Sequence, residues 1–140
     1  MRAGSYICIM KNALTTTERK RLRSPHQPVG RWIRVDARLA IYLRDSFRCL
    51  YCSRDLHGAD PCDVTLDHVV AKIDGGSNAP SNLITACRAC NSSRQDQSVS
   101  RFASREARIE IRRNLRRSMT SYRRLAKAII ADEAGCEETI

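Results

Sequence analysis

Apolar side chains recur at helical spacing in two parts of this chain. In the first part, this spacing predicts a helix that begins with Asp36 as its N-cap and ends near Ser46. The apolar positions on its buried face are Leu39, Tyr42 and Leu43. Toward the C-terminus the same spacing predicts one long helix, capped by Ser104 and stopped at Gly135. Its apolar positions are Ile111, Leu115, Met119, Tyr122, Leu125, Ala126 and Ile129.

Between these two helices, the pattern indicates a small hairpin. Residues 63–70 and 83–86 are rich in valine, leucine, isoleucine and threonine, and a polar loop with two adjacent glycines separates them. Residues 88–96 suit a short helix. The order of elements therefore predicts a small α+β fold, with one helix before a ββα unit and one long helix after it.

Charge is distributed unevenly along the chain. Its 140 residues carry 25 lysines and arginines and 15 acidic residues, a formal charge of +10, and 21 of the cations are arginine. Residues 1–48 carry 11 cations and 3 anions, residues 49–98 carry 4 and 6, and residues 99–140 carry 10 and 6. Arginine pairs with phosphate through two N–H groups, so this excess indicates a polyanionic partner, nucleic acid ahead of a membrane surface.

The charge and the periodicity together divide the chain into three parts. Residues 1–30 form a basic N-terminal arm, in which residues 15–23 suit one or two helical turns. Residues 31–98 form a core with its preceding helix, and residues 99–140 form the basic C-terminal helix. No apolar run approaches the ~20 residues of a membrane span. We therefore expect a protein of the reducing cytoplasm, without a membrane partner.

Four of the seven cysteines form two pairs of identical spacing, Cys49-x-x-Cys52 and Cys87-x-x-Cys90, with 34 residues between them. Each pair presents two thiolates to one ion, and four thiolates suit tetrahedral Zn²⁺. The alternative is a redox pair, but no thioredoxin-like βαβ pattern accompanies either one. We therefore predict one structural zinc ion, with the 34 intervening residues as a functional insertion held by the metal.

The remaining cysteines and histidines outside the insertion's motif have no such spacing. An odd number of cysteines disfavours a complete disulfide framework. Cys62 or His57 remains open as a substitute zinc ligand, although neither has the spacing of the pairs. Cys8, Cys136 and His26 are expected to be ordinary residues without a metal-binding role.

The insertion and its end contain residues suited to phosphodiester hydrolysis. The carboxylate of Asp67 and the amide oxygen of Asn91 are hard donors that suit Mg²⁺ or Mn²⁺. The neighbouring His68 is a ready general base for water. A base that makes the nucleophile and a cation that stabilises charge on phosphate are what this reaction needs.

Taken together, the motifs resemble the four-cysteine branch of the HNH endonuclease family. The match covers roughly residues 44–96, and its elements are Cys-x2-Cys, Leu-Asp-His-Val-Val, Gly-Gly, Asn-Leu and Cys-x2-Cys-Asn. The resemblance implies a zinc-stapled, treble-clef-like ββα-metal core, here with flanking helices. It also implies a DNA endonuclease that uses a histidine base and one divalent cation, Mg²⁺ or Mn²⁺, beside the structural zinc.

The resemblance also implies a role for each site residue. His68 would activate the attacking water, and Asp67 and Asn91 would hold the catalytic cation. Asn82 would brace the loop after the first strand and orient His68. Adjacent residues of a regular strand point to opposite faces, so Asp67 and His68 can share a site only at a twisted strand end or a bulge.

Two other functions are compatible with the same motifs. One is a zinc-dependent DNA-binding module that does not cut, and the other is a nuclease subunit that depends on a partner within a larger DNA-processing complex. Small chains with this motif resemble phage or mobile-element proteins. The sequence leaves the oligomeric state and the DNA target open.

Overall fold

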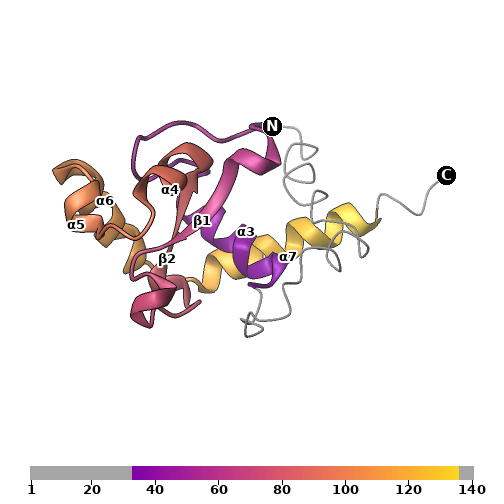
Figure 1. Cartoon of the computed structure of the whole chain (residues 1–140). Coiled ribbons are helices and arrows are strands. Elements are labelled where there is room, and N and C mark those ends of the chain that lie inside the picture. Colours follow the sequence, from indigo (N-terminus) through magenta and orange to yellow (C-terminus); the bar gives the residue numbers. More distant parts are fainter. Residues whose placement is uncertain (1–32, 136–140) are drawn as a thin grey trace, which may run out of the picture.

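A computed structural model describes residues 33–135 of the chain, and Figure 1 shows a central hairpin with helices on both sides. The basic arm, with the turns expected at residues 15–23, lies outside this range, as do Cys8, His26 and Cys136. The helices and strands are α3 (Val35–Arg44), β1 (Val64–His68), β2 (Leu83–Cys87), α4 (Arg88–Arg94), α5 (Val99–Phe102), α6 (Arg105–Leu115) and α7 (Thr120–Gly135). Short 3-10 turns are η1 (Pro61–Asp63), η2 (Lys72–Asp74) and η3 (Pro80–Asn82). No helix in residues 33–135 is long and apolar enough to cross a membrane.

The two strands form the antiparallel hairpin that the sequence predicts. Their register runs without interruption from the pair Val64 and Cys87 to the pair His68 and Leu83. All five residues of β2 are buried, because α3, α4 and α6 all pack against this strand. The helix α4 follows β2 directly, so the ββα order and the small α+β fold are confirmed.

Apolar side chains gather in two clusters on either side of the hairpin. One cluster joins α3 and α7 to the two strands, around residues such as Leu39, Phe47 and Ala126. The second joins α5 and α6 to β2, around Ile84 and Ile111. Figure 1 shows α3 and α7 side by side, with α5 and α6 at the opposite end of the molecule. The flanking helices therefore clamp the hairpin from two sides.

The first helix differs from the prediction at its start. It begins at Val35, with Arg34 rather than Asp36 at the N-cap, and Asp36 lies in the first turn. There its carboxylate still favours the positive end of the helix dipole and accepts a hydrogen bond from Arg34 Nε at 3.2 Å. The predicted buried face is confirmed for Leu39 and Tyr42, whereas Leu43 is partly buried.

The prediction of one long C-terminal helix is wrong. Ser104 does cap a helix, because its side chain accepts from the backbone N–H of Ala107. That helix, α6, ends at Leu115, and α7 begins only at Thr120. The break lets α6 pack on the second cluster while α7 packs along α3, which a single straight helix cannot do.

A buried ion pair joins α3 to the hairpin. The side chains of Arg44 and Asp45 are 1% and 0% exposed, and Nε and Oδ1 lie 2.8 Å apart. Arg44 also donates to the carbonyls of Pro80 and Leu83, at 2.8 and 2.7 Å. Asp45 Oδ2 accepts from the backbone N–H of Thr85 at 2.8 Å. These bonds satisfy both charges and fix η3 and β2 against the end of α3.

We predict that Arg44→Ala destabilises the fold by about 3–5 kcal/mol, because it leaves the Asp45 carboxylate buried without its cation. The matched control is Arg34→Ala, which removes a pair whose arginine is 84% exposed and should cost no more than about 1 kcal/mol. Urea denaturation measures both. Equal losses of stability in the two variants would contradict the structural role of the buried pair.

Candidate functional site

The four paired cysteines meet at one point. Cys49 and Cys52 come from the turn before the insertion, whereas Cys87 ends β2 and Cys90 lies in the first turn of α4. Their sulfurs all lie within 4.8 Å of one another, and the Sγ atoms of Cys52 and Cys87 are 3.9 Å apart. A tetrahedral zinc ion with bonds of about 2.3 Å separates its sulfurs by about 3.8 Å. The cluster therefore fits one structural zinc ion.

Local backbone geometry brings these sulfurs together. Ser53 has a φ of 61°, which lets the chain turn back after Cys52, and its N–H donates to the carbonyl of Cys49 at 2.8 Å. At the other end, Cys87 is the N-cap of α4, and its Sγ accepts from the N–H of Cys90 at 3.4 Å. Each pair thus turns both of its sulfurs to the same side.

The substitute ligands that the sequence leaves open lie elsewhere. Cys62 is an exposed free thiol in η1, and the His57 ring pairs with the Asp55 carboxylate at 2.8 Å. Among residues 33–135, the four cysteines form the one cluster of three or more His, Cys, Asp or Glu side chains able to hold a metal.

Burial and hydrogen bonds shift the pKa values of the thiols in different directions. Burial raises the pKa of Cys49 and that of Cys90. Partial desolvation acts in the same direction on Cys52, but hydrogen bonds from the Arg54 backbone and the neighbouring thiols outweigh it and lower the pKa. Protons therefore compete with zinc for at least two of the four sulfurs.

Asp67 lies on the face of β1 that α4 covers. Its carboxylate is buried, and both oxygens accept from Arg94 Nη1, at 2.8 and 2.7 Å. Tyr51 also donates its hydroxyl to Oδ2 at 2.6 Å. Burial and then this bond to Asp67 raise the pKa of Tyr51, so its hydroxyl stays protonated and keeps donating.

Asn91 faces the same side of β1 as Asp67. Its Nδ2 donates to Thr65 Oγ1 at 3.0 Å, and Thr65 lies two residues before Asp67, on the same face of the strand. With Nδ2 held in this way, the amide oxygen points away from Thr65. Among residues 33–135, Asp67 Oδ1 accepts a hydrogen bond from Arg94 only, which leaves this oxygen one further lone pair. The Asp67 carboxylate and the Asn91 amide thus supply oxygen donors of the kind that Mg²⁺ or Mn²⁺ prefers.

His68 makes its side-chain contact with the loop after β1. Its Nε2 lies 2.8 Å from Oδ1 of Asn78. The strand register is regular through both Asp67 and His68, so no bulge interrupts the pairing here. The structure thus brings Asp67 and Asn91 to one face of β1, whereas His68, the next residue of a regular strand, starts from the opposite face at the end of the strand, where the loop begins.

Asn82 fixes the loop that carries Asn78. Its Oδ1 accepts from the N–H of Val70 at 2.8 Å, and its Nδ2 donates to the carbonyls of Val70 and Ser77, at 3.1 and 2.9 Å. Gly76 packs so closely on the Val70 carbonyl that any Cβ there would collide with it. Asn82 therefore bonds the backbone of the loop after β1, and the close approach at Gly76 requires a residue without a Cβ.

The site also contains three residues that the sequence pattern does not predict, Arg94, Tyr51 and Asn78. Arg94 is 2% exposed and donates to Asp67 and also to the backbone carbonyls of His68 and Val69, at 2.7 and 3.0 Å. One signal was available, because Arg94 follows Asn91 by three residues and so shares its helix face. Nothing in the sequence marks Arg94 as buried.

Comparison with known proteins identifies the central segment. Residues 49–97 match the family of HNH endonucleases. No curated protein and no solved structure matches the chain. With the cysteine cluster and the ββα unit already described, the match indicates an HNH endonuclease domain at residues 49–97, which is less than half of the chain.

We predict that zinc affinity falls as the pH falls, because zinc binds thiolates and burial raises the pKa of Cys49 and Cys90.

Cys52→Ser should lose zinc, whereas Cys62→Ser, which also changes an exposed cysteine, should keep one ion per chain. Elemental analysis and a zinc-binding dye measure content and affinity. Zinc-free folded wild-type protein, or equal zinc loss in both variants, would contradict this assignment.

A second prediction concerns the buried Asp67 carboxylate. Arg94→Ala should cost about 3–5 kcal/mol of stability, because the carboxylate loses its cation. Tyr51→Phe removes one hydrogen bond to the same charged group and should cost about 1.5–3 kcal/mol. Thermal or urea unfolding of zinc-loaded protein measures both. A larger loss of stability in Tyr51→Phe than in Arg94→Ala would overturn this ranking.

Proposed function

We propose that this chain is a metal-dependent endonuclease that hydrolyses phosphodiester bonds in DNA. The observation that carries the proposal is the placement of Asp67 and Asn91 on one face of β1, with His68 at the end of that strand. This arrangement lies within the segment that matches HNH endonucleases. Residues 31–98 would carry the chemistry, and the basic segments 1–30 and 99–140 would hold the DNA.

His68 is the general base in this proposal. Asn78 Oδ1 is an acceptor, so His68 Nε2 carries a proton and donates it to this bond. The other ring nitrogen, Nδ1, is then unprotonated in the neutral imidazole and can accept a proton from water. Asn78 thus selects the tautomer that a base requires, and Asn82 holds the loop from which Asn78 acts.

Asp67 and Asn91 would hold a Mg²⁺ or Mn²⁺ ion, which when bound stabilises the negative charge that develops on phosphate and the leaving oxygen. The protein's own part is to orient the Asp67 carboxylate and to balance its charge. Arg94, on α4, and Tyr51, in the turn between Cys49 and Cys52, both donate hydrogen bonds to this carboxylate. Arg94 also bonds the His68 carbonyl, so one guanidinium positions both residues.

The test of this proposal uses two histidines of the same chain. His68→Ala should lower the rate of DNA cleavage by roughly 10²–10⁴-fold, because the base is removed. Zinc content and DNA affinity should stay close to wild type, since His68 binds neither ion here. The matched control is His57→Ala, which removes an exposed histidine from the Asp55 pair outside the site. Single-turnover cleavage of a labelled duplex measures both.

Three outcomes separate the candidate functions. Wild-type rates in His68→Ala would remove the proposed base. Zinc-loaded wild-type protein that binds DNA but never cuts it would favour the non-cleaving module. Cutting that begins only when a partner protein is added would favour the partner-dependent subunit.

A further inference from the structure

A pocket of about 580 Å³ opens where η3 meets the junction between α6 and α7. It lies outside the site described above. Arg44 fixes the backbone of one lining residue, because it donates to the Pro80 carbonyl at 2.8 Å. Residues at its wall include Pro80 and Ser81 from η3, Leu115 from α6 and Met119 between the two helices. The break between α6 and α7, which the sequence does not predict, creates this pocket.

Among the described residues, the charged side chains that line the pocket are all cations, and none is acidic. Its four charged residues are Arg117, Arg123, Arg124 and Lys127. All four are exposed, and none pairs with a carboxylate among the described residues. Arg117 is held in place by the Arg44 carbonyl and the Tyr122 hydroxyl, at 3.4 and 3.3 Å, and these bonds leave its charge uncompensated. A site of this kind attracts an anion.

The pocket lies close to His68 through the hairpin. Ser81 is two residues before Leu83, so their Cα atoms lie at most about 7 Å apart. Leu83 is the cross-strand partner of His68, at a Cα distance of about 5 Å in such pairs. The wall of the pocket is thus within about 12 Å of His68, a distance that a short stretch of DNA spans easily.

We propose that this pocket seats a backbone phosphate of the DNA duplex, on the strand that runs past His68. Guanidinium groups bind phosphate oxygens through paired N–H bonds, and a duplex carries one negative charge per about 1.7 Å of its axis. The apolar wall formed by Leu115 and Met119 suits the sugar between phosphates. The position relative to His68 rests on the proposed nuclease function, whereas the phosphate contact itself does not.

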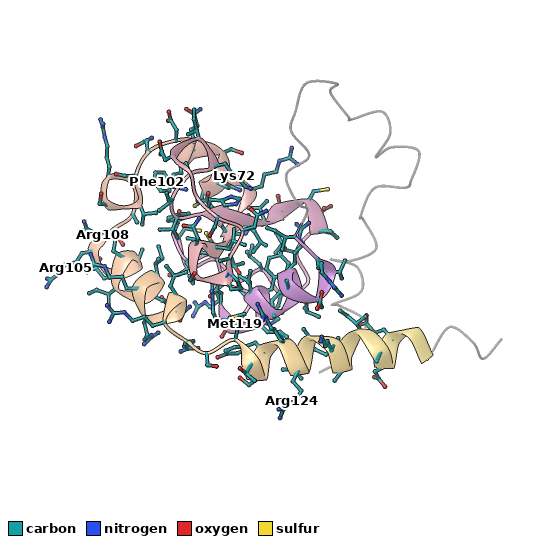
Figure 2. The ribbon with its side chains drawn as sticks, turned by 90° about the horizontal axis from the view of Figure 1, so that it is seen from below. Lys72, Phe102, Arg105, Arg108, Met119 and Arg124 are labelled. Atoms are coloured by element: carbon teal, nitrogen blue, oxygen red, sulfur yellow. The ribbon has the colours of Figure 1, made fainter. Side chains whose placement is uncertain are left out.

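The experiment compares two variants of the full chain that each remove two positive charges. Arg123→Gln with Lys127→Gln changes the pocket, because these residues are one turn apart on α7 and both line it. Arg105→Gln with Arg112→Gln is the control, because both are exposed on α6 and neither lines the pocket. Figure 2 shows Arg105 projecting away from the domain on α6, far from Arg124 on α7.

The measurement is the affinity for a fluorescent duplex of about 20 base pairs, taken without added Mg²⁺ or Mn²⁺ over a range of salt concentrations. The pocket variant should lower the slope of log affinity against log salt by about 0.9 for each phosphate that the protein no longer neutralises. At physiological salt this is about a fivefold weakening for the one phosphate that the pocket binds. The control variant also removes two cations of the basic C-terminal segment, so it should weaken binding and lower the slope, but by clearly less than the pocket variant, since surface charges outside the contact are screened within about 8 Å.

Two results would overturn the inference. Equal reductions of affinity and slope in both variants would mean that DNA is attracted by the overall positive charge and not by a phosphate-binding site in the pocket. An acidic peptide of matched charge that binds the wild type as tightly as DNA, and binds the pocket variant more weakly, would assign the pocket to a protein partner.

The inference and the proposed function fail in different ways. If wild-type protein cuts DNA but both variants bind alike, the pocket assignment alone is wrong. If wild-type protein never cuts but the pocket variant has the reduced salt slope, the phosphate seat stands and the nuclease function falls. Zinc content and far-UV circular dichroism confirm that each variant is folded.

Discussion

The convergence of four sulfurs fixes the position of everything else in this domain. Cys49 and Cys52 are joined in space to Cys87 and Cys90 across an insertion of 34 residues, so the loop that carries the candidate chemistry starts and ends at one point. The apolar clusters are small, and a unit of this size gains much of its stability from a bound metal. Because Cys87 ends β2 and Cys90 lies in the first turn of α4, the meeting of the sulfurs fixes the positions of both elements. The helix α4 then packs on β1.

Two buried arginine–aspartate pairs, together with the metal site, hold the helices against the hairpin. Arg44 and Asp45 tie α3 to η3 and β2, and Arg94 and Asp67 tie α4 to β1. Each arginine also satisfies backbone carbonyls at the loop end of the hairpin. The same polar contacts that hold the fold thus orient the candidate active site, so a substitution at these positions is expected to reduce stability and activity together.

Much of this architecture could be predicted from the sequence, for local reasons. The repeated Cys-x-x-Cys spacing predicts the metal cluster, and runs of β-branched residues predict the two strands, because both signals depend on neighbours along the chain. The prediction of one long C-terminal helix is wrong because helical periodicity continues through residues 116–119, although the chain turns there so that α7 reaches the apolar cluster around Leu39 and Phe47. Arg94 and Asn78 escape prediction because their partners lie 10 to 27 residues away, which no local pattern reports. The basic pocket exists only because of the unpredicted break.

The most direct test of the central claim is cleavage of supercoiled plasmid DNA by the purified, zinc-loaded chain, with Mg²⁺ or Mn²⁺ present in one reaction and chelated in the other. Nicked or linear DNA is expected only where the divalent cation is present, with zinc content unchanged between the reactions. Plasmid that stays supercoiled under every divalent cation tested, with protein that is folded and zinc-loaded, would contradict this claim.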